Sequence, residues 1–217
     1  MFRGKAQYVP ISRNKEPRNE ATTYARNLVK SEFDRYGSDM MNDYQKIMNQ
    51  GCFYLPNFFC QTSDRLIYNN LKNDIDANDK EGMVQWSKHY KHENPEFSET
   101  FNDIIKKMGE HFGVEVIQTR MNYYGDGLDW KPFHHDRNAY GKTVEDFTMG
   151  ASFGDTRELE FKHERSGSRF KFPQNNGDVF AFNSEINKIF LHGVPKSRKK
   201  VGPRISIIAW GKKLENK

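Results

Sequence analysis

Two short motifs constrain the fold of this chain more than any other feature. His134 and Asp136 lie two positions apart, and His192 follows after a long interval. Residues two apart on an extended strand point to the same face, so one strand can present His134 and Asp136 to a single metal ion. His192 must then arrive from a strand later in the chain. Two imidazoles and one carboxylate suit a non-haem Fe(II) site with open positions, although zinc could bind the same set.

A candidate anion site begins twelve residues after His192. Arg204 carries a planar, permanently charged group that binds carboxylates bidentately, and Ser206 lies on the same face of the expected strand. Asn122 and Tyr124 share the face of an earlier strand. We expect these four residues to bind a dicarboxylate cosubstrate, 2-oxoglutarate, beside the metal, and O2 to take a remaining open position. The sequence therefore predicts an Fe(II)- and 2-oxoglutarate-dependent dioxygenase.

The hydrophobic pattern changes its period partway along the chain. Helical spacing is found over residues 21–36, 38–47, 66–75 and 98–112, and a period of two begins at residue 114. Turn-forming residues separate strands expected near 114–124, 131–136, 147–153, 158–163, 169–172, 177–182, 189–194 and 203–210. Many short strands at this spacing are typical of a sandwich or barrel. We therefore expect an α+β, mainly β fold, in which N-terminal helices pack against a double-stranded β-helix, or jelly roll.

The remaining chain suggests one dioxygenase domain over residues 21–217. It would comprise a helical and lid segment, 21–113, and the jelly-roll core, 114–211, after a basic, flexible arm over residues 1–20. The two cysteines give neither a disulfide framework nor zinc spacing. The first residues lack an apolar signal core, and no run is long enough to cross a membrane. We therefore expect an intracellular protein, nuclear or cytoplasmic, that is a monomer with no membrane partner.

The charge balance leaves room for a polyanionic partner. The net charge is +5, and part of this excess follows His192 directly, in a cluster formed by Lys196, Arg198, Lys199 and Lys200. Such a cluster is most often a solvated loop. Its position just after a metal-ligand strand makes contact with phosphates the second interpretation.

Five motifs follow one another over roughly residues 114–210: Asn122-x-Tyr124, His134-x-Asp136, Ser152-Phe153-Gly154-Asp155-Thr156-Arg157, Phe190-Leu191-His192-Gly193-Val194 and Arg204-x-Ser206. In this order they resemble the motifs of the AlkB-like 2-oxoglutarate dioxygenases. The resemblance implies a jelly-roll fold with an N-terminal lid. It also implies oxidative removal of alkyl groups from nucleic-acid bases or, in some relatives, from protein side chains. The alkyl carbon would be hydroxylated and released as an aldehyde, while 2-oxoglutarate becomes succinate and carbon dioxide.

The chain departs from that family at two positions. Trp210 stands where a second Arg is usual, and Asn138 stands where an acidic residue is frequent. Arg157, which follows a turn, is either a surface ion-pair residue or a contact near the substrate mouth. Trp86 and Tyr90 are either packing residues or faces on which a base stacks.

The expected substrate is an alkylated nucleic acid. Its base must be single-stranded or flipped, because an enzyme cannot reach a stacked base inside a duplex. The candidate contacts are Asn138, Arg157, Trp86, Tyr90 and the cationic cluster of Lys196, Arg198, Lys199 and Lys200. Two alternatives stay open: a dioxygenase that acts on a protein or small molecule, and a jelly-roll binding module without catalysis.

Overall fold

The computed structural model describes residues 18–26, 51–78, 83–84, 89–141 and 143–215. Of the helix expected over 21–36, residues 21–26 are helical. The helix expected over 38–47 and nearly all of the basic arm lie outside the described residues. No helix in the described part of the chain is long and apolar enough to span a membrane.

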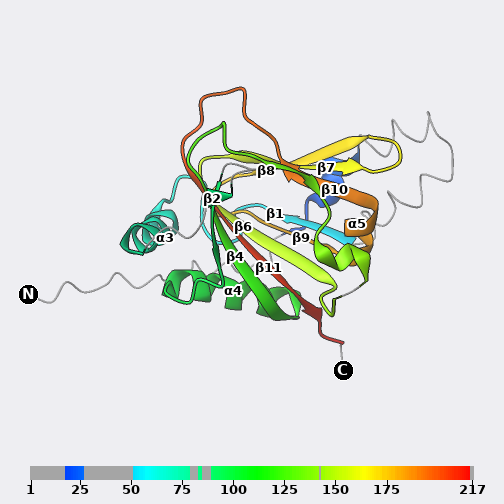
Figure 1. Ribbon diagram of the computed structural model, residues 1–217, viewed down its shortest axis with the longest axis horizontal. Coiled ribbons are helices and arrows are strands. Elements are labelled where there is room, and N and C mark those ends of the chain that lie inside the picture. Colours follow the sequence, from blue (N-terminus) through cyan, green and yellow to red (C-terminus); the bar gives the residue numbers. More distant parts are fainter. Residues whose placement is uncertain (1–17, 27–50, 79–82, 85–88, 142, 216–217) are drawn as a thin grey trace, which may run out of the picture.

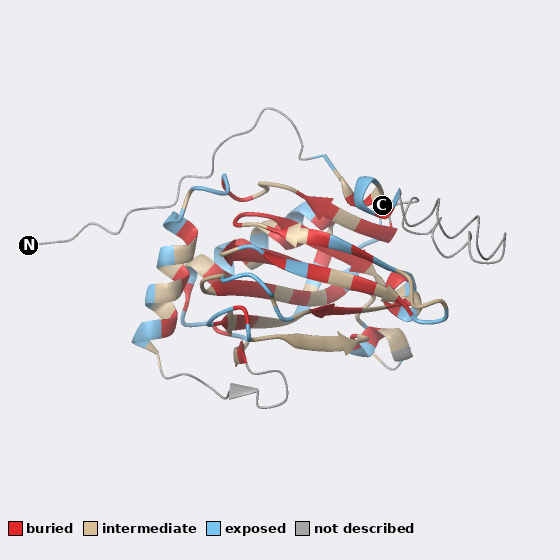
Figure 2. Cartoon of the chain, turned by 90° about the horizontal axis from the view of Figure 1, so that it is seen from above, coloured by how far each residue is buried: buried red, intermediate tan, exposed pale blue. Residues whose placement is uncertain are grey.

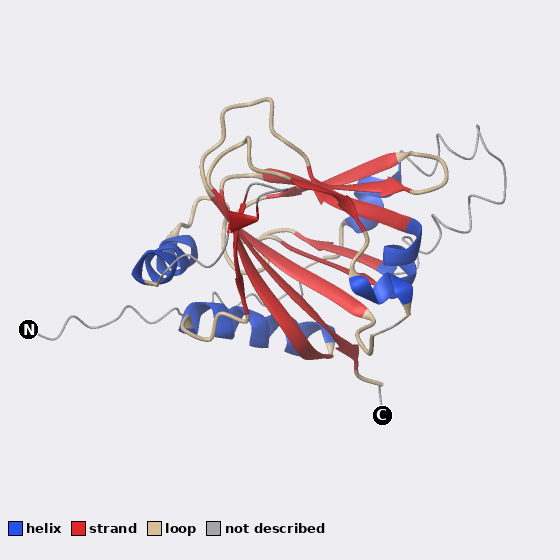
Figure 3. Cartoon of the chain, viewed as in Figure 1, coloured by secondary structure: helices blue, strands red, loops and turns tan. Residues whose placement is uncertain are grey.

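Two antiparallel sheets form the body of the molecule, as Figure 3 shows. The seven-stranded sheet has the order β1 (Cys52–Leu55), β9 (Val179–Asn183), β6 (Phe147–Gly154), β11 (Arg204–Lys213), β4 (Val114–Tyr124), β3 (His89–Glu93), β2 (Met83–Val84). The four-stranded sheet has the order β5 (Lys131–His134), β10 (Phe190–Val194), β7 (Arg157–His163), β8 (Arg169–Gln174). This architecture confirms the predicted mainly β, jelly-roll fold.

Two helices, α3 (Leu66–Ala77) and α4 (Glu99–Phe112), lie on the side of the seven-stranded sheet that faces away from the four-stranded sheet (Figure 1). The ends of α4 follow its sequence signals. The hydroxyl of Ser98 accepts a hydrogen bond from the Phe101 N–H, and Gly113 ends the helix with φ of 59°. The helix buries Phe101, Ile104 and Met108 against the sheet. The predicted helix over 98–112 is therefore confirmed.

Alternation along the central strand β11 separates two cores. Ile205, Ile207 and Ala209 belong to the apolar cluster shared with α3 and α4. Arg204 and Ser206 point to the opposite face, between the two sheets. Figure 2 shows that buried residues follow the strands through the middle of the molecule. The strand thus places polar side chains in a largely buried interior, which is where the candidate site lies.

One local expectation was wrong, and one short helix was not expected from the sequence. The strand expected over 131–136 ends at His134, and Asp136 leads into a short 3₁₀ helix, η2 (Arg137–Tyr140). A helix, α5 (Ser184–Ile189), directly precedes β10. Its start is fixed because the side chain of Asn183 accepts a hydrogen bond from the Ile186 N–H.

Candidate functional site

Three side chains with metal-binding atoms converge between the sheets. His134 ends β5, Asp136 follows it, and His192 lies at the centre of β10, where it is the direct partner of His134. The Nε2 atom of each histidine lies 3.6 Å from Oδ1 of Asp136, and all three ligand atoms lie within 4.8 Å of one another. Nε2 of His134 is buried without a hydrogen-bond partner. A cation bound between these atoms would satisfy that nitrogen, so the residues fit a metal ion.

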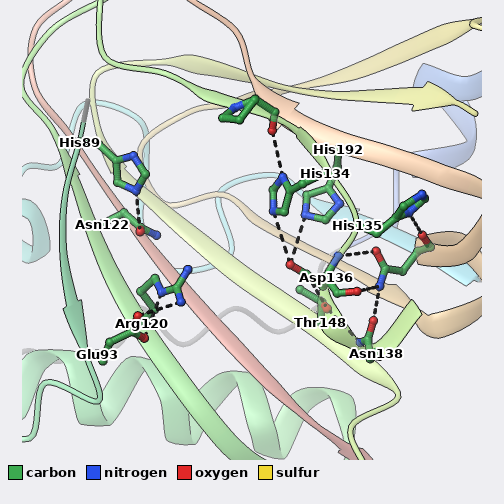
Figure 4. Close-up of polar contacts among 12 residues, drawn as sticks. His89, Glu93, Arg120, Asn122, His134, His135, Asp136, Asn138, Thr148 and His192 are labelled. Atoms are coloured by element: carbon green, nitrogen blue, oxygen red, sulfur yellow. Dashed lines mark hydrogen bonds and ion pairs between the residues drawn. The ribbon is translucent and has the colours of Figure 1, made fainter. Parts of the chain in front are cut away.

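The backbone and carboxylate of Asp136 are both held in place (Figure 4). The Thr148 hydroxyl donates to Oδ2 at 3.0 Å, which leaves Oδ1 directed at the two histidines. The Asn187 amide, on α5, accepts from the Asp136 N–H and donates to the Asp136 carbonyl, both at 3.0 Å. Such outer contacts orient metal ligands and usually matter for affinity. Sequence reasoning missed Thr148 and Asn187, because neither shares a motif with the ligands.

The protonation states of His192 and Asp136 suit the binding of a divalent cation. Burial lowers the pKa of His192 to about 4, and the nearby His134 acts in the same direction, so the His192 imidazole is neutral at physiological pH. Burial alone would raise the pKa of the Asp136 carboxyl, but interactions with His192 and His134 outweigh it and hold that pKa well below its usual range. The cluster therefore offers a neutral imidazole and an ionised carboxylate.

His135 takes no part in this cluster. It points away from the other two histidines (Figure 4), and its Nδ1 contacts the backbone carbonyl of Asn187. Its Nε2 lies 3.6 Å from a carboxylate oxygen of Glu164. The alternation of side chains along an extended chain explains why His134 and Asp136, but not His135, face the metal position.

A deeply buried guanidinium lies on the same interior surface. Arg204 is 1% exposed and donates from Nε to the Ser152 hydroxyl at 2.8 Å, while its Nη1 is buried without a hydrogen-bond partner. Burial lowers its pKa to about 10, so the group stays cationic at neutral pH. An unpaired buried cation is costly, and a carboxylate would satisfy it. The structure places Ser206, Asn122 and Tyr124 around the same cavity as Arg204 and the three metal-binding residues.

His89 holds the two cavity residues of β4. Its Nε2 lies 3.1 Å from the side-chain oxygen of Asn122, and its ring stacks on Tyr124 with centroids 4.9 Å apart. These contacts fix the amide of Asn122, which Figure 4 shows beside His89, and the phenol ring of Tyr124. Sequence reasoning missed His89, because it falls in a stretch expected to be irregular.

A second, wider cavity opens on the other side of the metal-binding cluster. Its volume is about 270 Å³, and it shares His134, Asp136, Lys131 and Trp210 with the inner cavity. Its other lining residues are Gln118, Arg120, His135, Arg137, Asn138, Thr143 and Glu145. The Thr143 hydroxyl is buried there without a hydrogen-bond partner. This outer cavity is placed to hold a polar group next to a metal ion.

Trp210 lies between the two cavities, where the resembled family usually has its second Arg. The guanidinium of Arg120 lies 5.2 Å above the indole. Arg120 is itself held by two contacts to Glu93, at 3.0 and 2.8 Å. Among the described residues, Arg204 is therefore the arginine that lines the inner cavity. The indole of Trp210 stands where the resembled family usually has a second arginine.

Two predicted substrate residues have their polar groups occupied by the protein. Arg157 is buried and donates to the backbone carbonyls of Asp126, Asp129 and Pro195 at 2.7–2.9 Å. It thus ties loops together instead of forming a surface ion pair, and it does not line either cavity. Asn138 lines the outer cavity, but its amide contacts the side chains of Thr148 and Asn187.

The remaining substrate candidates lie outside both cavities or outside the described residues. Tyr90 pairs with Tyr123, whose ring packs on the core beneath α3 and α4, so Tyr90 faces away from the metal-binding cluster. This position agrees with the packing interpretation of Tyr90 and not with its interpretation as a stacking face. Trp86 lies outside the described residues. The cationic cluster is exposed on the loop between β10 and β11 and lines neither cavity; its members are Lys196, Arg198, Lys199 and Lys200.

Comparisons with known proteins agree with this geometry. Residues 44–213 match the family model of the 2OG-Fe(II) oxygenase superfamily. Uncharacterized protein R406 of Acanthamoeba polyphaga mimivirus is 30% identical over 112 residues, which cover 51% of this chain and 58% of that relative. The match is to the superfamily, so it does not confirm the narrower AlkB-like resemblance.

Solved structures share the fold at low sequence identity. A prolyl-4-hydroxylase of Pseudomonas putida is 15% identical with a TM-score of 0.57, covering 78% of this chain and 96% of that chain. An oxidoreductase of the 2OG-Fe(II) oxygenase family from Burkholderia pseudomallei is 15% identical with a TM-score of 0.55, covering 80% and 93%. OsALKBH1 aligns with a TM-score of 0.49, at 15% identity, over 74% of this chain and 97% of that chain. The first two likenesses show the fold and leave the substrate open.

Proposed function

The chain belongs to the 2OG-Fe(II) oxygenase superfamily, and we propose that it removes N-linked alkyl groups from nucleic-acid bases by oxidation. Enzymes of this superfamily use Fe(II), 2-oxoglutarate and O2. The metal-binding set of His134, Asp136 and His192 suits that iron. Membership and the oxidoreductase neighbours support an enzyme over a binding module without catalysis.

The inner cavity supplies a site for 2-oxoglutarate in this proposal. Arg204 binds the distal carboxylate with its unpartnered Nη1, and Ser206 donates a second hydrogen bond to it. Asn122 and Tyr124, held by His89, contact the end nearer the metal. Because these side chains are already fixed, little ordering remains when the cosubstrate binds.

The outer cavity is the single observation that carries the substrate proposal. It lies directly beside the metal-binding residues, it has the indole of Trp210 on one side, and it presents polar groups of Gln118 and Thr143. Pockets for small ligands combine apolar or aromatic walls with a few convergent polar groups. A flipped base needs that combination, because its flat ring is apolar and its edge forms hydrogen bonds.

Iron and 2-oxoglutarate, held by the residues named above, would supply the oxidising chemistry for hydroxylation of the N-alkyl carbon. One atom of O2 would enter the alkyl group, and the other would end in succinate, as carbon dioxide leaves 2-oxoglutarate. The hydroxylated carbon then separates from nitrogen as an aldehyde, and the base recovers its N–H or lone pair. The protein holds the ring so that only the alkyl carbon reaches the metal.

The nucleic-acid backbone contacts the exposed cationic cluster in this proposal. No ion pair with a carboxylate is formed by these side chains within the described residues, so their charges are available to phosphates. The cluster comprises Lys196, Arg198, Lys199 and Lys200. Phosphate contacts of this kind give affinity and position without reading sequence.

A second candidate is oxidation of a protein or small molecule. The observation in its favour is that Arg137 and Glu145 both line the outer cavity, which offers opposite charges to a dipolar substrate such as a peptide. The cationic cluster is also separate from that lining.

A formaldehyde-release screen decides between the two candidates. The enzyme, with Fe(II), 2-oxoglutarate and O2, is given methylated oligonucleotides, methylated peptides and free methylated nucleosides. We expect formaldehyde from the oligonucleotides. Release from peptides alone, or a peptide mass increase of one oxygen without release, would replace the first proposal with the second.

A further inference from the structure

Lys131 reaches the metal-binding region because of an irregularity in β5. The register pairs His134 with His192 and Lys131 with Val194, so three steps on β5 match two steps on β10. The extra residue turns Lys131 to the face that carries His134, although simple alternation would separate them. Phe133 points outward, where the Nζ of Lys162 lies 6.0 Å from its ring centroid.

Gly193 permits this irregularity. A Cβ atom at position 193 would lie 2.9 Å from the carbonyl oxygen of Lys131 and 3.0 Å from the backbone of Pro132. Such contacts are too close for any side chain, so the bulged backbone of β5 needs glycine opposite it. The placement of Lys131 is thus built into both strands.

Lys131 borders both cavities and has no counter-ion. It lines the inner and the outer cavity, and no carboxylate of the described residues lies within ion-pair distance of its Nζ. Burial lowers the pKa of its amine to about 8, with Asp136 opposing that shift. The amine therefore remains mostly cationic at neutral pH. Lys131 is half-buried, so a bound molecule that covers its amine must supply an acceptor for it.

The other charged residues that line the outer cavity do not neutralise the positive charge of Lys131 that a bound substrate would meet. Arg120 is already paired with Glu93, and Asp136 is directed at the metal position. Asn138 is neutral. Glu145 is the remaining carboxylate among the described residues that line this cavity. Arg137, which carries the opposite charge, lines the same cavity. A positively charged ring beside Lys131 would meet repulsion in a site that water screens poorly.

We propose that Lys131 selects the alkylated base by charge, donating a hydrogen bond to a ring carbonyl oxygen and excluding rings that carry a positive charge. The inference rests on the proposed function, because it takes a base as the substrate. The favoured class is a neutral N-alkylated base with a carbonyl group beside the alkylated nitrogen, such as N3-methyluracil. The disfavoured class is a cationic base such as protonated N3-methylcytosine.

The two methylated pyrimidines provide a size-matched test. Trinucleotides carry one central N3-methyluracil or N3-methylcytosine, and binding is measured at pH 7 with Mn(II) and 2-oxoglutarate under anaerobic conditions, so that no turnover occurs. The wild type should bind the uracil trinucleotide at least about tenfold more tightly, since a hydrogen bond to a charged group is gained and a like charge avoided. Lys131→Met should reduce that ratio to below about threefold.

Two further variants serve as controls. Lys131→Arg keeps the charge and should keep the preference. Lys162→Met removes a lysine from the same sheet, on the face that carries Phe133, and should leave the ratio unchanged. Equal binding of both trinucleotides by the wild type, or a full preference retained by Lys131→Met, would overturn the role of Lys131. Binding of neither trinucleotide would instead overturn the proposed function, and this inference with it.

Discussion

His134 and His192 are direct partners across the antiparallel β5–β10 pair, and their ring centroids lie 4.3 Å apart. Residues opposite each other on neighbouring strands have the closest side chains in a sheet. The pairing therefore brings together two imidazoles that are far apart in sequence, and Asp136 completes the set from just beyond the end of β5. The metal-binding cluster is a consequence of strand register.

The first prediction concerns Asp136. Asp136→Ala should lower the affinity for Fe(II) by more than about 100-fold and abolish turnover, because loss of a ligand exceeds the usual effect of losing an outer contact. Metal content after dialysis measures the effect, and circular dichroism checks the fold. Thr148→Val removes the hydrogen bond that orients the carboxylate, together with the weaker contact from the Asn138 amide, and should cost about 10–100-fold in metal affinity. Full metal binding by Asp136→Ala would exclude this carboxylate as a ligand.

The second prediction concerns the cosubstrate. Arg204→Ala should raise the dissociation constant for 2-oxoglutarate by at least about 100-fold, because a buried carboxylate left without its partner costs about 3–5 kcal/mol. Titration calorimetry with Mn(II) in place of iron measures it. Arg204→Lys keeps a charge but loses the planar fork, so an intermediate constant is expected. An unchanged constant for Arg204→Ala would mean that another residue binds the carboxylate.

The third prediction concerns the cationic cluster of Lys196, Arg198, Lys199 and Lys200. Changing all four to Ser should weaken binding to every oligonucleotide alike and reduce the slope of log affinity against log salt by up to about three for single strands. A control variant changes Lys106 and Lys107, on α4, to Ser and should leave the slope unchanged. Equal slopes for the wild type and the four-residue variant would remove this loop from the binding surface.

The fourth prediction concerns the two free cysteines. Burial raises the pKa of Cys60 to about 11 and raises the pKa of Cys52 still further, so both thiols stay protonated at pH 8. Because the thiolate is the nucleophile, iodoacetamide should label neither cysteine of the folded protein at pH 8, and should label both in guanidinium chloride. Raising the pH towards 11 should release Cys60 first. Prompt labelling of Cys60 at pH 8 would show that its thiol is exposed and ionised.

Local spacing predicted much of the fold and part of the site. The two-residue interval between His134 and Asp136 survives even though the strand ends between them, because the chain stays extended through Asp136, with φ of −71° and ψ of 158°. Arg204 and Ser206 share one face of β11 as the alternation required, with Asn122 and Tyr124 on the neighbouring strand. These are short-range relationships, which a sequence carries directly.

Other parts of the site depend on contacts that spacing does not encode. Lys131 faces the interior because β5 contains an irregularity, and Asn187 holds Asp136 from a helix, α5, that lies between two expected strands and was not itself expected. Arg157 follows a turn as expected, but three backbone carbonyls from two other loops occupy its guanidinium. Tyr90 faces the helices because of its pairing with Tyr123. Each of these outcomes is set by long-range pairing.

The most direct test of the metal and cosubstrate site is the visible absorption of the protein with Fe(II) and 2-oxoglutarate under anaerobic conditions. Bidentate binding of the 2-oxo acid to iron should give a charge-transfer band for the wild type. The band should be absent for Asp136→Ala, and for Arg204→Ala it should appear only at much higher 2-oxoglutarate. A wild-type protein that retains Fe(II) but shows no band at saturating 2-oxoglutarate would contradict this account of the site.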